Sequence, residues 1–421
     1  MKKLLLILLC LPMIGFGQGW VKEYILNSGC AGHTVLNTSD GGFIILGEQD
    51  FDADSIEDMF IIKTDGNGTL DWSKDFVGND QFIGGVIKHT NDGGYIIITS
   101  KQDSASSEVF LIKIDNLGNQ QWQKAHTLMG GVDNVYPSDI QQTSDGGFIL
   151  NSISLSDHSV HLIKTDVNGN LLWEKIIGRL GIGSVEQTID SGFIIPISDT
   201  IIKTNLQGDI EWKKTLSSTA NFLYQIQTVR KTIDSGYIAA ATKSSLTTWP
   251  PQYTPVLIKT DSNGNVDWEK NMNGEGFVVS AFQTTDGGYI CNSSASSSGL
   301  GIMLDKTDAN GNIIWTKSFT SFGSSSLSYG RSAPKQTSNN GYVFTGQIID
   351  TLNTSVVLIK TYLVKTDGNG NITSTFNIPT PNSNRKLQKT VDILGRETKA
   401  TNQPLFYIYD DGTVEKRMVI E

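Results

Sequence analysis

Two short motifs return along this chain at a nearly constant spacing. The first motif, Thr-x-Asp-Gly-Gly followed by Phe or Tyr, has seven copies if Ser or Asn is allowed at its inner positions. The copies begin at Thr38, Thr90, Thr143, Thr188, Thr232, Thr284 and Thr337, and their spacing lies between 44 and 53 residues. A period of about 50 residues is typical of propellers and solenoids, so the sequence indicates one repetitive fold.

The second motif is Lys followed two residues later by Asp or Asn, at Asp65, Asp115, Asp166, Asn205, Asp261, Asp308 and Asp367. Six copies continue to a Trp, at Trp72, Trp122, Trp173, Trp212, Trp268 and Trp315. The seventh copy has Ser374 at that position. The segment WVKEYIL, which starts at Trp20, resembles the Trp-bearing segments. The strand that the last repeat lacks is therefore predicted at the N-terminus.

Each repeat contains four runs of strand length that are bounded by Gly, Asn and Asp. No run of a dozen residues has helical spacing. If the segment at Trp20 completes the seventh sheet, the ring closes and the sheet edges are protected. We predict an all-β fold, a seven-bladed β-propeller of four-stranded blades that is closed by the N-terminal strand and followed by a small β domain. A solenoid is the alternative, but it would need distinct capping ends.

One copy of the second motif, LIKTDVNGNLLWEK, has oxygen-bearing side chains at alternate positions, Asp166, Asn168 and Asn170. A calcium loop would want Gly at its sixth position and Glu at its twelfth, whereas Gly169 is fourth here. Asn-Gly instead supplies the positive φ angles of a tight hairpin, and the Asp166 side chain can bond to the turn backbone. The order of Asp, Gly and Trp also resembles the tryptophan-docking motif of quinoprotein propellers, from which we take only the packing role of the Trp.

Chain direction places the Thr-x-Asp-Gly-Gly turns and the Asn-Gly hairpins on one face of the disc. The connections between second and third strands, and those between blades, fall on the other face. These connections vary in length, and variable loops on a rigid scaffold often carry binding sites. Two of them contain candidate ligand-binding residues, Trp249 with Tyr253 and Tyr329 with Arg331. Aromatic side chains that pack on their own loops are an equally good interpretation.

A third connection reads DFDADSIED, and its Asp50, Asp52 and Asp54 alternate like calcium ligands. The loop lacks the Gly of a calcium loop, so a solvated acidic loop is the preferred interpretation and a calcium site the alternative. Calcium is the single cofactor that the sequence suggests.

No catalytic residue can be assigned from the sequence. The histidines, His33, His89, His126, His158 and His161, are scattered and match neither a metal nor a triad spacing. No carboxylate pair stands out for hydrolysis, and the phosphate-loop, zinc and nucleophile-elbow patterns are missing.

The N-terminus has the form of a secretory signal peptide over residues 1–17. Lys2 and Lys3 precede an apolar run that is too short to span a bilayer, which needs about 20 residues. Cleavage would change the formal net charge from −10 to −12, and an acidic secreted protein is a poor partner for nucleic acid. The two cysteines that remain, Cys30 and Cys291, are interpreted as small buried side chains.

The repeats, with the residues before them, fill residues 18–376, and a polar linker follows over residues 377–385. Residues 386–421 resemble the C-terminal sorting domain of the type IX secretion system of Bacteroidetes. The resemblance rests on two segments, DILGRE and LFYIY, and on the acidic and basic residues after them. Its candidate signal residues are Gly395, Arg396, Glu397, Asp411, Gly412, Lys416 and Arg417. The resemblance implies recognition by that secretion machinery, export, removal of the tail, and release or attachment to the outer cell surface.

These observations favour a secreted or surface-displayed propeller that binds a glycan or protein ligand without catalysis, and that has no transmembrane segment. An extracellular polysaccharide hydrolase or lyase is one alternative, and a structural or adhesive surface protein is another, since the fold does not decide function. Carboxylates or histidines clustered in the central channel would favour an enzyme. An open channel beside aromatic patches would favour binding.

Overall fold

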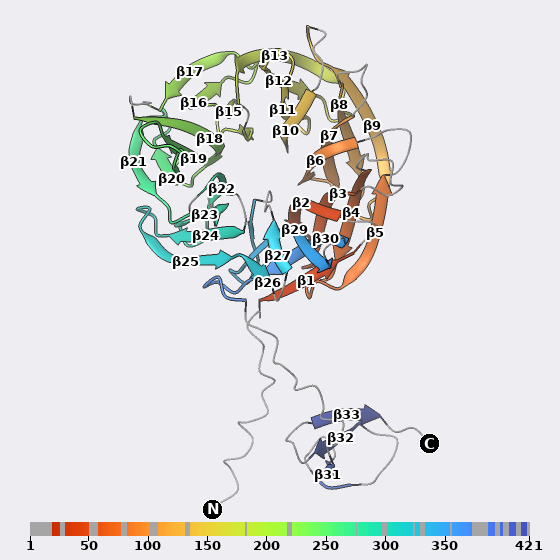
Figure 1. The fold of residues 1–421 in the computed structure, drawn as a ribbon. Helices are drawn as coiled ribbons and strands as arrows, with labels where there is room; N and C mark the ends of the chain where they lie inside the picture. The colour runs from red at the N-terminus through yellow and green to blue at the C-terminus, as the bar shows by residue number, and fades with distance from the viewer. Residues whose placement is uncertain are drawn as a thin grey trace, which may run out of the picture.

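The computed structural model describes residues 19–25, 30–49, 58–76, 82–101, 108–130, 135–181, 183–216, 221–274, 276–295, 301–322, 325–328, 333–353, 356–372, 386–391, 396–398, 404–409 and 414–418. Every regular element within these ranges is a β-strand. Seven sheets surround a common axis, as Figure 1 shows. The predicted all-β, seven-bladed propeller is confirmed.

In blades 1 to 3 the strands follow the chain from the axis outward. Blade 1 contains β2 (Cys30–Asn37), β3 (Phe43–Gln49), β4 (Asp58–Thr64) and β5 (Leu70–Phe76). Blade 2 contains β6 (Phe82–His89), β7 (Tyr95–Lys101), β8 (Glu108–Ile114) and β9 (Gln120–Thr127). Blade 3 contains β10 (Val135–Gln142), β11 (Phe148–Ser154), β12 (Ser159–Thr165) and β13 (Leu171–Arg179).

Blades 4 to 6 repeat this order. Blade 4 contains β14 (Glu186–Gln187), β15 (Phe193–Ile197), β16 (Thr200–Thr204) and β17 (Ile210–Thr215). Blade 5 contains β18 (Phe222–Lys231), β19 (Tyr237–Ser245), β20 (Tyr253–Thr260) and β21 (Val266–Asn271). Blade 6 contains β22 (Val278–Gln283), β23 (Tyr289–Ser294), β24 (Ile302–Thr307) and β25 (Ile313–Phe319).

Blade 7 joins the two ends of the repeat region. It contains β28 (Lys335–Gln336), β29 (Tyr342–Asn353), β30 (Val356–Lys365) and β1 (Trp20–Tyr24). Strand β1 pairs antiparallel with β30, with Trp20 opposite Lys365. A short hairpin, β26 (Ser321–Phe322) and β27 (Ser325–Ser328), extends the sheet through β29, which the sequence did not predict.

The cores of the propeller lie between blades. The middle strands bury residues on both faces, as in β11 and β12, because each sheet is covered by the next on either side. The outermost strands are only partly covered, as in β17. Seven apolar clusters result, one between each pair of neighbouring blades. The cluster between blades 7 and 1 includes Tyr24, Val35 and Leu363, so β1 is part of that core.

The stretch around Asp166 is a hairpin turn between β12 and β13. The Asp166 Oδ1 accepts hydrogen bonds from the backbone N–H groups of Asn168 (2.9 Å) and Asn170 (2.8 Å), as predicted. Gly169 has a φ of 75°, but Asn168 does not have a positive φ, so the expectation for Asn168 was wrong. The register shift beside Thr165 explains this, because a hairpin with a bulge needs one left-handed residue.

The two repeated motifs meet inside each blade through a buried Lys. In blade 3 the Lys164 Nζ lies 2.9 Å from the Asp145 Oδ2 and donates a hydrogen bond to the Thr165 carbonyl. The corresponding pairs are Lys63–Asp40, Lys113–Asp92, Lys203–Asp190, Lys259–Asp234 and Lys306–Asp286. Blade 7 differs, because its Lys365 corresponds to these lysines and Asn339 stands at the place of the Asp.

Each Trp on an outer strand packs against the hairpin of the next blade. Trp122 lies so close to Gly169 that a Cβ there would be 2.7 Å from the ring. The other contacts are Trp72 on Gly118, Trp173 on Gly208, Trp212 on Gly264, Trp268 on Gly311, Trp315 on Gly370 and Trp20 on Gly68. The packing role expected for the Trp is thus confirmed, and Trp20 of β1 makes the same contact on blade 1.

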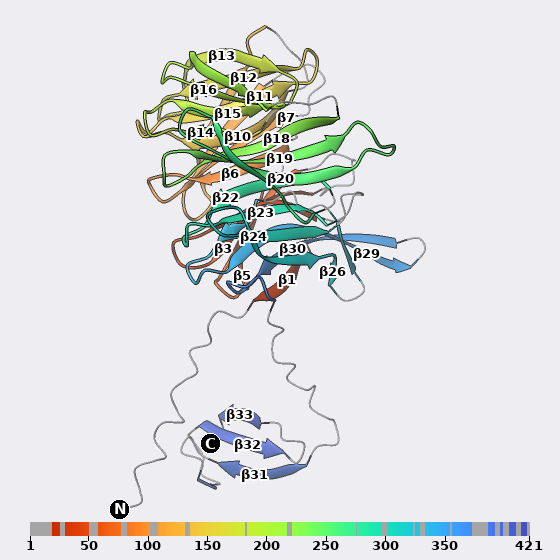
Figure 2. The same cartoon turned by 90° about the vertical axis from the view of Figure 1, so that its left-hand side faces the viewer.

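The two faces of the disc carry different connections. Figure 2 views the disc edge on and shows the β29–β30 hairpin and the β19–β20 connection projecting from the same side. We call this side the loop face, and the opposite side, with the Thr-x-Asp-Gly-Gly turns, the turn face.

The C-terminal residues form a separate antiparallel sheet of three strands. These are β31 (Leu387–Val391), β32 (Pro404–Tyr409) and β33 (Val414–Met418), in the order β31-β32-β33.

Candidate functional site

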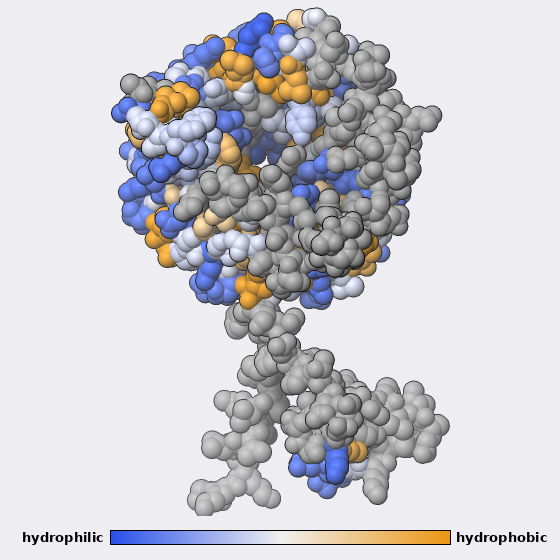
Figure 3. Space-filling model, in the orientation of Figure 1, coloured by the Kyte–Doolittle hydropathy of each residue, from blue (hydrophilic) through white to orange (hydrophobic). Residues whose placement is uncertain are grey.

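A cavity of about 540 Å³ lies in the central channel, where the innermost strands of the blades converge. Figure 3 views the loop face and shows a hollow near its centre. Each innermost strand runs from the loop face to the turn face, where it ends at the recurring Thr. Position along the strand therefore measures depth, at about 3.3 Å per residue. Counting back from the Thr separates the lining residues into layers.

One layer is formed by the residues four positions before the recurring Thr. All seven of them line the cavity, and they are Thr34, Val86, Asp139, Ser184, Thr228, Ser280 and Ala333. In several blades the preceding residue also lines the cavity, as His33, Ser138 and Gln227 do. The cause is a β-bulge at this point of the innermost strand, for example between Pro137 and Asp139 and between Ile226 and Thr228. A bulge turns two successive side chains toward one side, which doubles the polar groups of the cavity wall.

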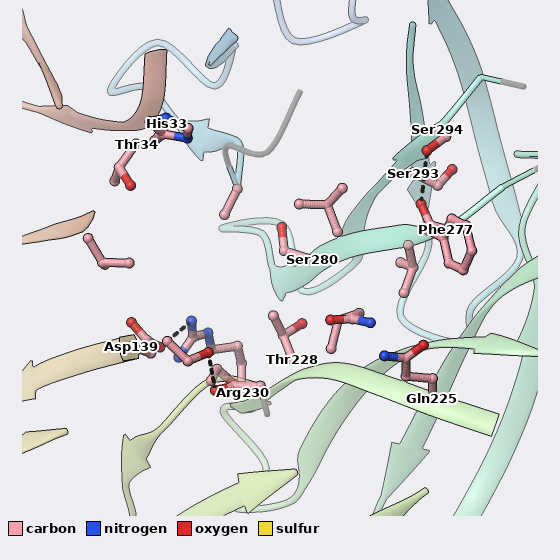
Figure 4. Close-up of a pocket in the computed structure, with 18 of the residues that line it drawn as sticks. His33, Thr34, Asp139, Gln225, Thr228, Arg230, Phe277, Ser280, Ser293 and Ser294 are labelled. Atoms are coloured by element: carbon pink, nitrogen blue, oxygen red, sulfur yellow. Dashed lines mark hydrogen bonds and ion pairs between the residues drawn. The ribbon is translucent and has the colours of Figure 1, made fainter. Parts of the chain in front are cut away.

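A deeper layer, two positions before the recurring Thr, supplies three cations to the cavity, Lys88, Arg230 and Lys335. They come from blades 2, 5 and 7. Asp139, from blade 3, accepts from the Lys88 Nζ at 2.7 Å and from the Arg230 Nη2 at 3.0 Å. Figure 4 shows Asp139 and Arg230 joined in this way, with His33 and Thr34 on the far side of the cavity. Asp139 is the one carboxylate among the described lining residues.

The charges in this layer shift one another's ionisation. Burial acts to raise the pKa of Asp139, but the charges and hydrogen bonds of Lys88 and Arg230 outweigh it and lower the pKa to about 2. Burial, together with the charges of Lys88 and Arg230, lowers the pKa of Lys335 to about 7. Arg230 also has Glu186 near it, with 3.9 Å between the Arg230 Nη1 and the Glu186 Oε2. Three basic side chains, of which Lys335 is only partly protonated at pH 7, thus face two carboxylates, and the floor of the cavity keeps a small excess of positive charge.

The wall nearer the loop face contains an aromatic pair and a hydroxyl group. Phe277 lines the cavity, and its ring centroid lies 4.5 Å from that of Tyr253. Ser293 also lines the cavity and is 2% exposed, and its Oγ has no hydrogen-bond partner within the described part of the chain. A buried hydroxyl without a partner is uncommon, so this group calls for an explanation.

The sequence-predicted binding residues lie in different places. Tyr253, the first residue of β20, reaches the cavity wall through Phe277. Trp249 lies on the β19–β20 connection and is 92% exposed. Tyr329, Arg331 and the acidic positions Asp50, Asp52 and Asp54 lie outside the described residues. Sequence reasoning missed the cations of the channel, although counting back from each recurring Thr would have found Lys88, Arg230 and Lys335.

The candidate sorting residues belong to the C-terminal sheet or its connections. Glu397 forms an isolated bridge with Val391, and Lys416 and Arg417 lie on β33 opposite Phe406 and Leu405. Arg396 is described as well, whereas Gly395, Asp411 and Gly412 are outside the described residues.

One group of side chains has the composition of a catalytic triad. The His161 Nδ1 lies 2.6 Å from the Glu174 Oε1, and its Nε2 lies 2.7 Å from the Ser159 Oγ. Ser159 and His161 are completely buried, and the Ser159 hydroxyl also donates to the Asp157 carboxylate. A nucleophile must reach its substrate, so we interpret the group as a buried hydrogen-bond network in blade 3.

Metal ligation has no support in the described residues, where no three His, Cys, Asp or Glu side chains gather closely enough to hold an ion. Cys30 and Cys291 are both buried and free. The regular structure described here contains no helix that could cross a membrane.

Comparison with known proteins yields fold neighbours only. No protein family and no curated protein matches the sequence. A crystal structure of a Bacteroides caccae protein of unknown function is similar at 14% identity and a TM-score of 0.42, over 66% of this chain and 93% of that one. A Dyadobacter fermentans protein of unknown function matches at 8% identity and a TM-score of 0.47, over 83% and 99%. The WD40 domain of Neurospora crassa Pan2 matches at 11% identity and a TM-score of 0.46, over 83% and 95%.

Proposed function

We propose that this protein is an extracellular binding protein whose ligand enters the central cavity from the loop face. The observation that carries the proposal is the state of Asp139. Asp139 is held by the Lys88 Nζ at 2.7 Å and the Arg230 Nη2 at 3.0 Å, and its pKa is lowered to about 2, so it is unsuited to the general-acid role that glycoside hydrolysis requires. The other lining side chains that we have named are hydroxyls, an amide, basic groups, an imidazole, an aromatic ring and the aliphatic Val86 and Ala333, which suit recognition.

The ligand is a glycan or a protein segment, and the aromatic residues of the β19–β20 connection contribute to its recognition. Tyr253 supports the cavity wall through Phe277, and Trp249 offers an exposed ring on the same connection. Aromatic rings supply large contact areas at low entropic cost. The connections with Tyr329 and Arg331, and an acidic loop with calcium at Asp50, Asp52 and Asp54, remain part of this proposal.

A glycan array with the full chain tests the proposal. We expect binding to a defined group of glycans, weakened at least tenfold by Tyr253→Ala and by Phe277→Ala, with a smaller loss for Trp249→Ala. Lys214→Gln is the control, because Lys214 lies on the outer strand β17 and bonds to the exposed Asn265 side chain. Binding that none of the three aromatic substitutions changes would show that the site is elsewhere.

We further propose that the protein is exported by the type IX secretion system through residues 386–421, after removal of residues 1–17. A separate small sheet at the C-terminus supports this, together with the sequence resemblance. The test is expression in a Bacteroidetes host with and without residues 386–421. Mass spectrometry should find Gln18 at the N-terminus of the secreted protein, and secretion of the truncated chain at an equal level would contradict the proposal.

We also propose that the pairing of β1 with β30 closes the ring in the secreted protein, which a truncation or substitution at Trp20 can test.

A further inference from the structure

We propose that the ligand of the central cavity is an acidic saccharide, whose carboxylate lies against Lys88, Arg230 and Lys335 and whose hydroxyl groups face the layer above. This inference rests on the proposed binding function and specifies the chemistry of the same cavity.

The floor has more basic side chains than carboxylates, because Lys88, Arg230 and Lys335 face only Asp139 and Glu186 among the described residues, the latter 3.9 Å from the Arg230 Nη1. Asp139 already accepts from Lys88, Arg230 and the backbone N–H of Ile140, so its capacity is engaged in fixing these groups. Lys335 lies within the electrostatic range of both other cations, and also of Asp139 and His89. A ligand carboxylate at this place would relieve the repulsion among the cations, and Arg and Lys bind carboxylates through strong, charge-assisted hydrogen bonds.

The wall offers hydroxyl and amide groups at the height where a sugar ring would stand. The layer above the cations contains Thr34, Ser184, Thr228 and Ser280, and the bulges add Gln227. Ser184 and Ser280 already donate to the Val229 carbonyl and to the Asn292 Oδ1, so they offer a ligand their remaining lone pairs. Nearer the loop face, the buried Ser293 Oγ has no partner in the described chain, so a ligand hydroxyl would complete it. This group is independent of the cations, and it too indicates a ligand that can form hydrogen bonds.

The space and its aromatic wall suit a short saccharide. About 540 Å³ is within the range of small-molecule pockets, and the entry from the loop face passes Phe277. An acidic peptide would satisfy the cations equally well, and its backbone could bond to some of these polar groups. A saccharide, however, presents hydroxyl groups around its whole ring to the strands of several blades. An acidic saccharide has both the carboxylate and the ring of hydroxyl groups.

The test is calorimetric titration of the full chain with trigalacturonate, triguluronate and a hyaluronan tetrasaccharide, each beside its carboxyl-reduced neutral form. We expect at least one acidic form to bind, with carboxyl reduction weakening it by about 10- to 100-fold. Lys335→Gln and Lys88→Gln should weaken it by a similar factor, whereas Lys214→Gln should leave it unchanged. Ser293→Ala should weaken it to a smaller extent.

The other outcomes overturn the inference in distinguishable ways. If neutral forms bind as tightly as acidic ones and Phe277→Ala abolishes both, the binding function stands and the acidic ligand is wrong. Equal binding of triglutamate or of inorganic phosphate would show that charge alone is recognised. If no saccharide of the panel binds, the acidic saccharide is wrong, and the glycan array then decides separately whether the binding function also fails.

Discussion

Lys164 and Asp145 form an ion pair of 2.9 Å that joins the two repeated motifs within one blade. The Lys164 side chain is 2% exposed, whereas that of Asp145 is 51% exposed, so the pair is open to solvent on one side. Asp145→Asn leaves a buried ammonium group without its counter-charge and should lower the free energy of unfolding by about 1–3 kcal/mol. Urea unfolding measures this loss. A change below a few tenths of a kcal/mol would show that the ion pair contributes little to the stability of the fold.

Blade 7 allows the reverse experiment. Burial lowers the pKa of Lys365, which has Asn339 at the position of the Asp in other blades. Asn339→Asp should raise the free energy of unfolding by about 0.5–1 kcal/mol, the range of half-exposed ion pairs. The variant should also lose this gain in high salt. A less stable variant would mean that the surroundings of Asn339 in blade 7 favour its neutral amide over a carboxylate.

The same pairs predict a loss of stability in acid. The pKa of Asp40 is lowered to about 2 by the hydrogen bond from Lys63, and hydrogen bonds outweigh burial to lower those of Asp92 and Asp234 to about 2. Because the folded values lie below the ordinary 3.8, this stability is present above pH 3.8 and is lost as the pH falls toward 2. Denaturant titrations across this interval should show a smaller decline for Asp40→Asn than for the natural chain. Parallel curves would contradict the prediction.

The two glycines of a Thr-x-Asp-Gly-Gly turn should respond differently to substitution. A Cβ at Gly146 would meet nothing closer than 3.9 Å, so only its φ of 84° opposes Gly146→Ala, at a cost of about 1–2 kcal/mol. A Cβ at Gly147 would lie 2.2 Å from the Thr165 carbonyl oxygen, which requires the backbone to move. Gly147→Ala should therefore destabilise the protein more. The sequence agrees, because Ser191 and Ser235 replace the first glycine, at φ angles of 66° and 68°, while the second is always kept.

Trp20 should matter for stability and Trp249 should not. Trp20 packs on Gly68 and lies edge-on to Phe43 at 5.8 Å, so Trp20→Ala should lower the free energy of unfolding by about 2–4 kcal/mol. Trp249→Ala removes an exposed ring and should change it by less than about 0.5 kcal/mol. Thermal unfolding of both variants is the measurement. Equal stability of the two would mean that β1 does not close the ring.

Lys335 should lower the stability of the folded protein while it contributes to ligand binding. Its pKa is lowered from 10.5 to about 7 in the folded protein. The destabilisation of the folded state by the buried ammonium group is therefore fully present below pH 7 and is lost as the pH rises toward 10.5. Lys335→Gln should therefore unfold at a higher denaturant concentration than the natural chain, with the largest difference below pH 7. The same variant should bind ligand more weakly. A variant that is less stable at pH 6 would show that Lys335 supports the fold instead.

The repeats allowed the propeller to be predicted because each carries its own turn and strand signals. The Asp of one motif and the Lys of the other recur together because they form an ion pair, as Lys164 and Asp145 do. The channel was harder to predict, because the bulge before Asp139 leaves no mark in the local pattern yet decides which side chains face the axis. The pairing of Ser159, His161 and Glu174 was also invisible in the sequence, since it depends on the register between β12 and β13.

The position two residues before each recurring Thr has a further consequence. Around the ring it holds Leu36, Lys88, Gln141, Glu186, Arg230, Phe282 and Lys335, while the turn that follows hardly varies. The turn residues that the repeats share hold each blade together, whereas this variable position lines the cavity in blades 2, 5 and 7 and packs on apolar cores in blades 1 and 6. Substitution at Lys88, Arg230 or Lys335 therefore changes the charge of the channel without altering the turn that follows. A propeller of this kind can therefore acquire a different ligand while its blades keep the same turns.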